Sequence, residues 1–126
     1  MEGAGPAESV DRVREGLRLF NEERFFEAHE ALEDIWHQER GEPRLFLQGL
    51  IQICAGLHHF QNGNLSGAAT LLLRGADKMR GYPPRYLGLD VSGILTAVDA
   101  CRARIEGIRA GTHSPDSLQL LKIDLG

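Results

Sequence analysis

The stretch FFEAHEALEDIW, residues 25–36, places one histidine and four acidic residues among three aromatic residues. In a helix of 3.6 residues per turn, Phe25, Leu32 and Trp36 share one face. His29 and Glu33 are four residues apart, so they are neighbours beside that face. A glutamate next to a histidine in apolar surroundings can transfer protons, because each group changes the other's affinity for a proton. The stretch therefore indicates a candidate site for acid–base chemistry, metal binding or a structural polar contact.

A second polar stripe follows in the apolar segment 43–61. Helical projection places Gln48, Gln52 and His59 on one side of that segment, beside Gly49 and Gly56. A buried amide or imidazole without a partner costs about 1–3 kcal/mol, so these groups need polar neighbours. His29 and Glu33 are the obvious ones, and the glycines leave room for a water or a small ligand. We predict one polar pocket between the two helices. Its candidate catalytic residues are His29, Glu33 and His59, and its candidate ligand-binding residues are Trp36, Gln52, Gln48 and Glu30.

His29, Glu33 and His59 could also bind a divalent metal, with an open position for a water molecule. The motifs fit only in part. HEALE has Glu33 where the His-Glu-x-x-His zinc signature has its second histidine. EDIWH has one residue more than the Glu-x-x-His of di-iron bundles. No nucleophile is evident, since Cys54 lies on another helix face and Ser66 lacks a nucleophile elbow. Enzymatic activity stays open.

Two other accounts of the polar residues remain. His29, Glu33, Gln52 and His59 could satisfy one another in a hydrogen-bond network that fixes helix register. Alternatively, the helices could form an interaction module that offers a groove to a partner peptide or to a second copy, as in a homodimer. The interaction module predicts a contiguous apolar surface, whereas the pocket predicts a concave site lined by histidines.

Helical periodicity appears along almost the whole chain, so we expect an all-α fold. It is a compact bundle of about five helices built from helical hairpins. A forty-residue shift aligns Phe20 with Phe60 and Ala28 with Ala68, as two similar hairpins would. The pattern is loosely like a tetratricopeptide unit, although a repeat array needs three or more copies.

GYPPRYLGLD, residues 81–90, predicts an ordered loop, since two prolines break the helix, and Tyr82 and Tyr86 are expected to anchor it to the core. The helices are expected at about 7–22, 25–39, 43–61, 65–79 and 91–111. Asn64 and Asp90 are the expected N-caps of the last two.

We expect residues 1–126 to form a single domain, with a flexible N-terminus over residues 1–6 and an extended C-terminal tail over residues 112–126. The net charge of −4 argues against binding to nucleic acid or to an anionic membrane surface. No apolar run is long enough to span a bilayer and no secretory signal is evident, which predicts a cytoplasmic protein. Cys54 and Cys101 lie on apolar helix faces, as buried reduced thiols do.

Two stretches, FNEERFFEAHEALEDIW and FLQGLIQICAGLHHFQNGNLSGAATLL, resemble the small bacterial and archaeal proteins grouped as domain of unknown function 309. The resemblance implies a compact all-helical fold with the His-Glu helix beside the Gln/His helix. It implies no activity, because the family is defined without one. His58 departs from the family pattern, in which that position is often aromatic. The positions that match the pattern are His29, Glu30, Glu33, Trp36, Gly49, Gln52, His59, Asn64 and Gly67.

Overall fold

The computed structural model describes the backbone of residues 6–125 and the side chains of residues 10–125. Within that range five α-helices carry the fold, and the predicted all-α class is confirmed. The helices are α1 (Pro6–Asn21), α2 (Phe25–Gln38), α3 (Pro43–Gln61), α4 (Leu65–Met79) and α5 (Val91–Arg109). Apart from Pro6, which begins α1, the predicted flexible N-terminus lies outside the described residues.

Short polar turns separate the helices. The Asn64 side chain accepts a hydrogen bond from the backbone N–H of Gly67 at 2.9 Å and caps α4. Asp90 does the same for α5 through Gly93 at 3.0 Å. Asn and Asp favour these positions because their side chains satisfy an amide that the first turn of a helix leaves unpaired. The predicted caps are therefore confirmed.

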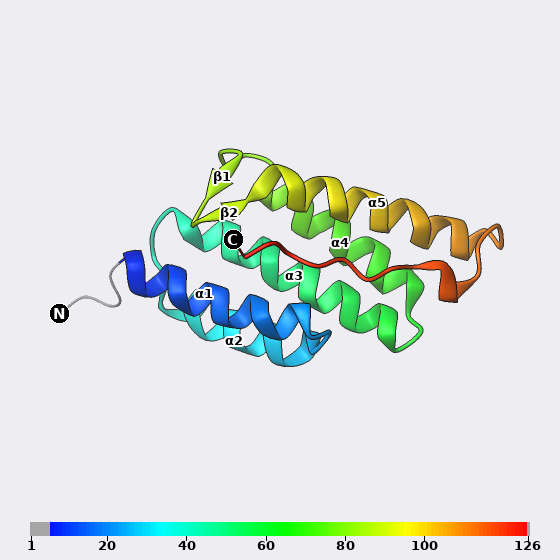
Figure 1. Cartoon of the computed structure of the whole chain (residues 1–126), viewed down its shortest axis with the longest axis horizontal. Coiled ribbons are helices and arrows are strands. Elements are labelled where there is room, and N and C mark those ends of the chain that lie inside the picture. The colour runs from blue at the N-terminus through cyan, green and yellow to red at the C-terminus, as the bar shows by residue number, and fades with distance from the viewer. Residues whose placement is uncertain (1–5, 126) are drawn as a thin grey trace.

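Consecutive helices pack against each other, so the chain forms a series of helical hairpins around one hydrophobic core (Figure 1). The helix α3 contributes the largest share of buried side chains, because it is apolar on almost every side. Figure 1 shows α1 and α5 on opposite sides of the face turned to the viewer, with the C-terminal segment running between them.

The backbones of α3 and α4 approach closely at two glycines. A Cβ atom at Gly75 would lie 2.6 Å from the carbonyl oxygen of Gly49, and a Cβ at Gly49 would lie 2.8 Å from that of Gly75. Both residues are buried. Glycine is therefore required at both positions by the space between the helices, and not by an unusual backbone conformation.

The loop between α4 and α5 contains a feature that the sequence analysis missed. Two short strands, β1 (Arg85–Tyr86) and β2 (Leu89–Asp90), pair in antiparallel register. The loop is anchored as predicted, because the hydroxyl of Tyr82 donates a hydrogen bond to the carbonyl of Glu42 at 2.5 Å. The same hydroxyl accepts one from the N–H of Phe46 at 3.1 Å.

After α5 the chain turns back across the molecule. A short 3-10 helix, η1 (Pro115–Ser117), leads into an extended segment, residues 118–125, which we call the strap. Leu121 and Ile123 are buried, whereas Lys122 and Asp124 are exposed. This two-residue alternation is that of an extended chain with one face on the core. The predicted extended tail is confirmed, with η1 as an addition.

Two further predictions concern membranes and cysteines. None of the helices in the described range is long and apolar enough to cross a membrane. Cys54 and Cys101 are free and buried, as predicted. Burial raises the pKa of the Cys54 thiol to about 12 and that of Cys101 to about 11, so both thiols are protonated at neutral pH. Neither is therefore an activated nucleophile.

Replacing Gly75 by alanine should destabilise the protein by about 1–3 kcal/mol, because the new methyl group overlaps the backbone of α3. Alanine's higher helix propensity, about 1 kcal/mol, offsets only part of that loss. Urea unfolding followed by circular dichroism measures the change. Gly81→Ala is the control, since a Cβ there would meet nothing within 4 Å. Equal stability of the two variants would contradict the close helix contact.

Candidate functional site

The structure places His29 and His59 on the wall of the same pocket between α2 and α3, as the helical projection predicted. The pocket holds about 120 Å³ and is also lined by Phe26, Ala55 and His58. Phe26 is half exposed, and its ring lies 5.5 Å from that of His58 between centroids. Phe26 was not predicted as part of the site, since aromatic residues at helical spacing are usually core residues.

His29 and Glu33 are neighbours along α2, but their contact is weak. Nε2 of His29 lies 3.8 Å from a carboxylate oxygen of Glu33, beyond hydrogen-bond distance. The two side chains are 25% and 40% exposed. Water therefore screens this pair. A proton-transfer pair needs its two groups within hydrogen-bond reach, and this contact is longer than that.

His59 makes its polar contact with the turn that follows its own helix. Nδ1 of His59 lies 3.1 Å from the side-chain nitrogen of Asn64, and the backbone N–H of Asn64 donates to the carbonyl of His59 at 2.8 Å. Asn64 also caps α4. His59 therefore fixes the α3–α4 turn, and no hydrogen bond joins it to His29 or Gln52 in the described structure.

The predicted ligand-binding residues are dispersed along the seam between the two helices. Trp36 lies under the guanidinium of Arg44, whose central carbon is 4.0 Å from the ring centroid. Gln48 and Gln52 are half-buried on α3, and Glu30 is exposed on α2. None of the four lines the histidine pocket. The alternative of a mutual hydrogen-bond network is also wrong, because no hydrogen bond in the described structure joins its four members to one another, namely His29, Glu33, Gln52 and His59. Among the described side chains, the buried atoms Nδ1 of His29, Nε1 of Trp36 and Oε1 of Gln52 have no hydrogen-bond partner.

The metal hypothesis is also corrected. Across the described residues, no three His, Cys, Asp or Glu side chains gather closely enough to hold a metal ion. His59 contacts Asn64, and the partly exposed Glu33 lies 3.8 Å from His29, so the predicted ligands His29, Glu33 and His59 do not converge. Zinc and other divalent metals need such convergence, because three or four ligands must reach one point.

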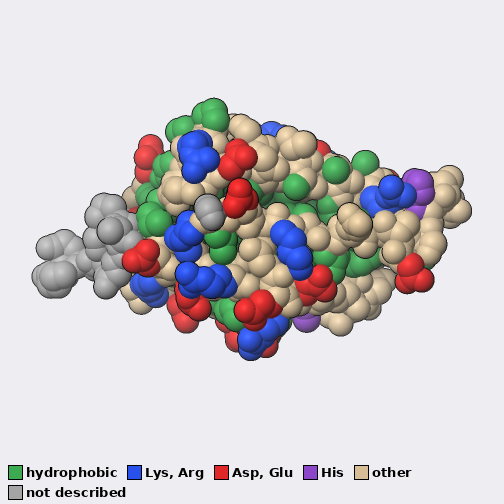
Figure 2. Space-filling view, in the orientation of Figure 1, with side chains coloured by type: hydrophobic (Ala, Val, Ile, Leu, Met, Phe, Trp, Pro, Cys, Tyr) green, Lys and Arg blue, Asp and Glu red, His purple; other side chains and the backbone are tan. Residues whose placement is uncertain are grey.

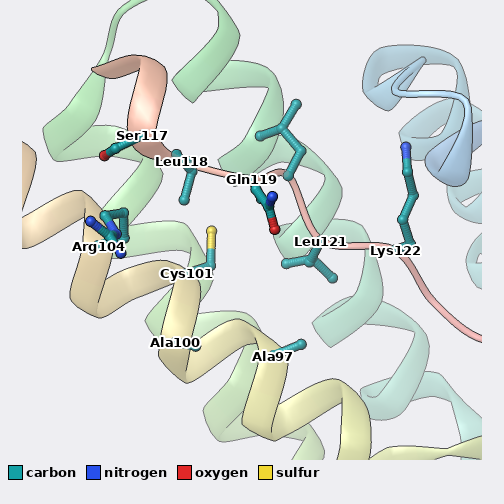
Figure 3. Close-up of a pocket in the computed structure, with 10 residues that line it drawn as sticks. Ala97, Ala100, Cys101, Arg104, Ser117, Leu118, Gln119, Leu121 and Lys122 are labelled. Carbon is teal, nitrogen blue, oxygen red and sulfur yellow. The ribbon is translucent and has the colours of Figure 1, made fainter. Parts of the chain in front are cut away.

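A larger hollow lies between the strap and α5. It holds about 680 Å³ and is drawn in Figure 3. We call it the strap groove. Ala97, Ala100, Cys101 and Arg104 of α5 form one wall, and Ser117 to Lys122 form the other. Hydrophobic side chains are visible along the line between α5 and the C-terminal segment in Figure 2.

Asn21, at the end of α1, holds the strap through its backbone. Its side-chain nitrogen donates to the carbonyl of Ile123 at 2.8 Å, and its side-chain oxygen accepts from the N–H of Ile123 at 2.8 Å. Both bonds go to groups that every non-proline residue carries. Asn21 therefore recognises an extended backbone, and the adjacent apolar contacts select the side chains. Arg14 extends the contact by donating to the carbonyl of Leu125.

Charged groups secure both ends of the strap region. Lys122 donates to the carbonyl of Asn21 at 2.6 Å and lies 3.2 Å from the carboxylate of Glu23. At the other end, the guanidinium of Arg104 lies 2.9 Å from Nδ1 of His113, which precedes η1. This geometry requires His113 to accept at Nδ1, because arginine can only donate.

Part of the chain matches a known family model. Residues 13–71 match the family model described as Domain of unknown function (DUF309). The predicted resemblance is thereby confirmed. The DUF309 segment runs from α1 into α4, so it includes the histidine pocket and Asn21 but neither α5 nor the strap.

An "Uncharacterized protein" of Aquifex aeolicus (strain VF5) is 26% identical over 91 residues, which cover 71% of this chain. The match covers 27% of that protein, so this chain spans about a quarter of the relative's length.

Glu33→Gln should change the free energy of unfolding by less than about 0.5 kcal/mol, because the exposed Glu33 forms no buried network. The neighbouring substitution Leu32→Ala should cost about 2–5 kcal/mol, since Leu32 is fully buried. Chemical denaturation of both variants tests this contrast. A loss above about 2 kcal/mol in Glu33→Gln would instead indicate a buried polar network.

Proposed function

We propose that this protein is an interaction module that binds an extended polypeptide segment on the face between α1 and α5. The observation that supports this function best is the pair of hydrogen bonds from the Asn21 side chain to the backbone of Ile123. The strap occupies the face as a bound peptide would, with alternate side chains buried. Its position provides an internal example of the kind of ligand that the face accepts.

The contacts on this face place one requirement on the backbone conformation of a bound segment and another on its side chains. Asn21 and Arg14 bind backbone groups and so require an extended chain. The buried positions of Leu121 and Ile123 require apolar side chains two residues apart. A partner segment that meets both conditions competes with the strap, which has the advantage of a high effective concentration in the same chain. Binding of a partner would then follow release of the strap.

A second candidate function is small-ligand binding in the pocket lined by Phe26, His29, Ala55, His58 and His59. The unpartnered Nδ1 of His29 favours it, since a bound polar group would supply the hydrogen bond that this atom lacks. The pocket's volume of about 120 Å³ is below the roughly 300–1,000 Å³ of most ligand sites. This function therefore ranks second.

The proposed module predicts that a strap peptide binds in trans once the strap of the full chain is loosened. Ile123→Asp places a charge at a site that is 3% exposed and so weakens strap docking. A fluorescently labelled peptide of residues 114–125 should bind this variant at least about ten-fold more tightly than it binds the wild-type protein. Fluorescence anisotropy measures both affinities.

Adding Asn21→Ala to the Ile123→Asp variant should weaken peptide binding by about ten-fold or more, because two hydrogen bonds of about 1 kcal/mol each are lost. Asn62→Ala is the matched control, since Asn62 is an exposed asparagine that follows the end of α3. Circular dichroism verifies that all variants are folded. Equal affinity with and without Asn21 would refute backbone recognition at this position.

A further inference from the structure

The strap groove stays open while the strap is docked. Its wall on α5 consists mainly of small side chains, those of Ala97, Ala100 and Cys101 (Figure 3). The groove's volume of about 680 Å³ lies within the roughly 300–1,000 Å³ of known ligand sites. The small residues leave space for larger apolar side chains from another molecule. Apart from Lys122, the residues that line this space make none of the described hydrogen bonds that hold the strap to α1.

The strap also presents unpaired backbone groups beside this groove. Within the described structure, the backbone N–H and C=O groups of Gln119 to Lys122 make no hydrogen bond to protein, and the backbone bonds of the strap to α1 begin at Ile123. In an extended chain, alternate residues direct these groups to opposite edges. One edge of the strap therefore offers free donors and acceptors on the side of α5. Such an edge is a template for another strand.

The charges around the groove point to the chemistry of the added strand. No acidic residue lines the groove, whereas Arg104 and Lys122 do. Lys122 is paired with Glu23, but the guanidinium of Arg104 has no carboxylate partner among the described residues and contacts His113 instead. A carboxylate would pair with Arg104 through charge-assisted hydrogen bonds. Arg104 lies at the end of the groove nearest η1.

We propose that the strap groove binds an extended segment of a partner protein, which adds as a strand to the free edge of the strap. This segment has apolar side chains at alternate positions, directed at the wall of Ala97 and Ala100, and an acidic residue next to Arg104. The inference rests on the proposed function in treating the face between α1 and α5 as a surface for extended chains. It differs in requiring the strap to stay in place.

The test uses the wild-type full chain labelled with ¹⁵N and a synthetic peptide of alternating valine and threonine with glutamate at both ends. The peptide should shift the amide resonances of Gln119 to Leu121 and of the groove wall on α5, with saturation below about 1 mM. Two matched control peptides carry N-methyl groups on alternate residues. One has the N–H groups of its first edge blocked, and the other has those of the opposite edge blocked. Because only one edge pairs with the strap, one control should lose binding and the other should retain it.

Two substitutions separate strand addition from adsorption. Arg104→Gln should weaken binding at least about five-fold for the glutamate peptide and leave a glutamine-ended peptide unchanged, because only the former loses an ion pair. Ala100→Phe should abolish binding by filling the groove from an exposed position on α5.

Several results would overturn the added strand. These are absence of shifts at 1 mM peptide, equal binding of both methylated peptides, or equal effects of Arg104→Gln on the two peptide charges. If the strap peptide binds the Ile123→Asp variant while this peptide fails to bind the wild-type chain, the added strand alone is refuted. If the alternating peptide binds the wild-type chain while the strap peptide fails to bind the Ile123→Asp variant, strap displacement is refuted instead.

Discussion

The contact between Gly49 and Gly75 sets the spacing on which the other elements depend. Because neither residue has a side chain, the backbones of α3 and α4 meet directly, and this pair becomes the centre of the bundle. The helix α2 then covers another side of α3, and α5 packs on α4. The outermost helices, α1 and α5, are left at the two margins of one face, and the strap bridges them (Figure 1). Both the position of the strap and the groove beside it follow from this arrangement.

Much of the helical framework was predictable because its signals are local. Apolar periodicity located the helices, and Asn64 and Asp90 identified the starts of α4 and α5. The strands β1 and β2 were missed, since two residues are too few for an alternation to stand out. Asn21 was missed as a site residue because its partner, Ile123, is 102 positions away. The alternation within residues 121–125 was the available signal, but it does not reveal which helix receives the strap.

The histidine site shows what helical projection can and cannot predict. Projection correctly predicted that His29 and His59 face the same seam, because the position of a residue around a helix follows from its number. It could not predict hydrogen bonds, which depend on side-chain rotamers and on nearby turns. His59 bonds to Asn64, five residues further along the chain, in preference to a residue on α2. Local geometry thus dispersed a cluster that sequence spacing had suggested, and the metal hypothesis failed for the same reason.

The bonds between the strap and α1 join residues that are more than 100 positions apart, so they are the most non-local contacts that hold this face. On the ribosome, the strap is synthesised after all five helices. The helical hairpins can form from neighbouring segments as they emerge, whereas the face between α1 and α5 remains bare until the strap arrives. During that interval the nascent chain exposes the apolar sites later covered by Leu121 and Ile123. Docking of the strap therefore removes from solvent an apolar surface through which newly made chains could aggregate.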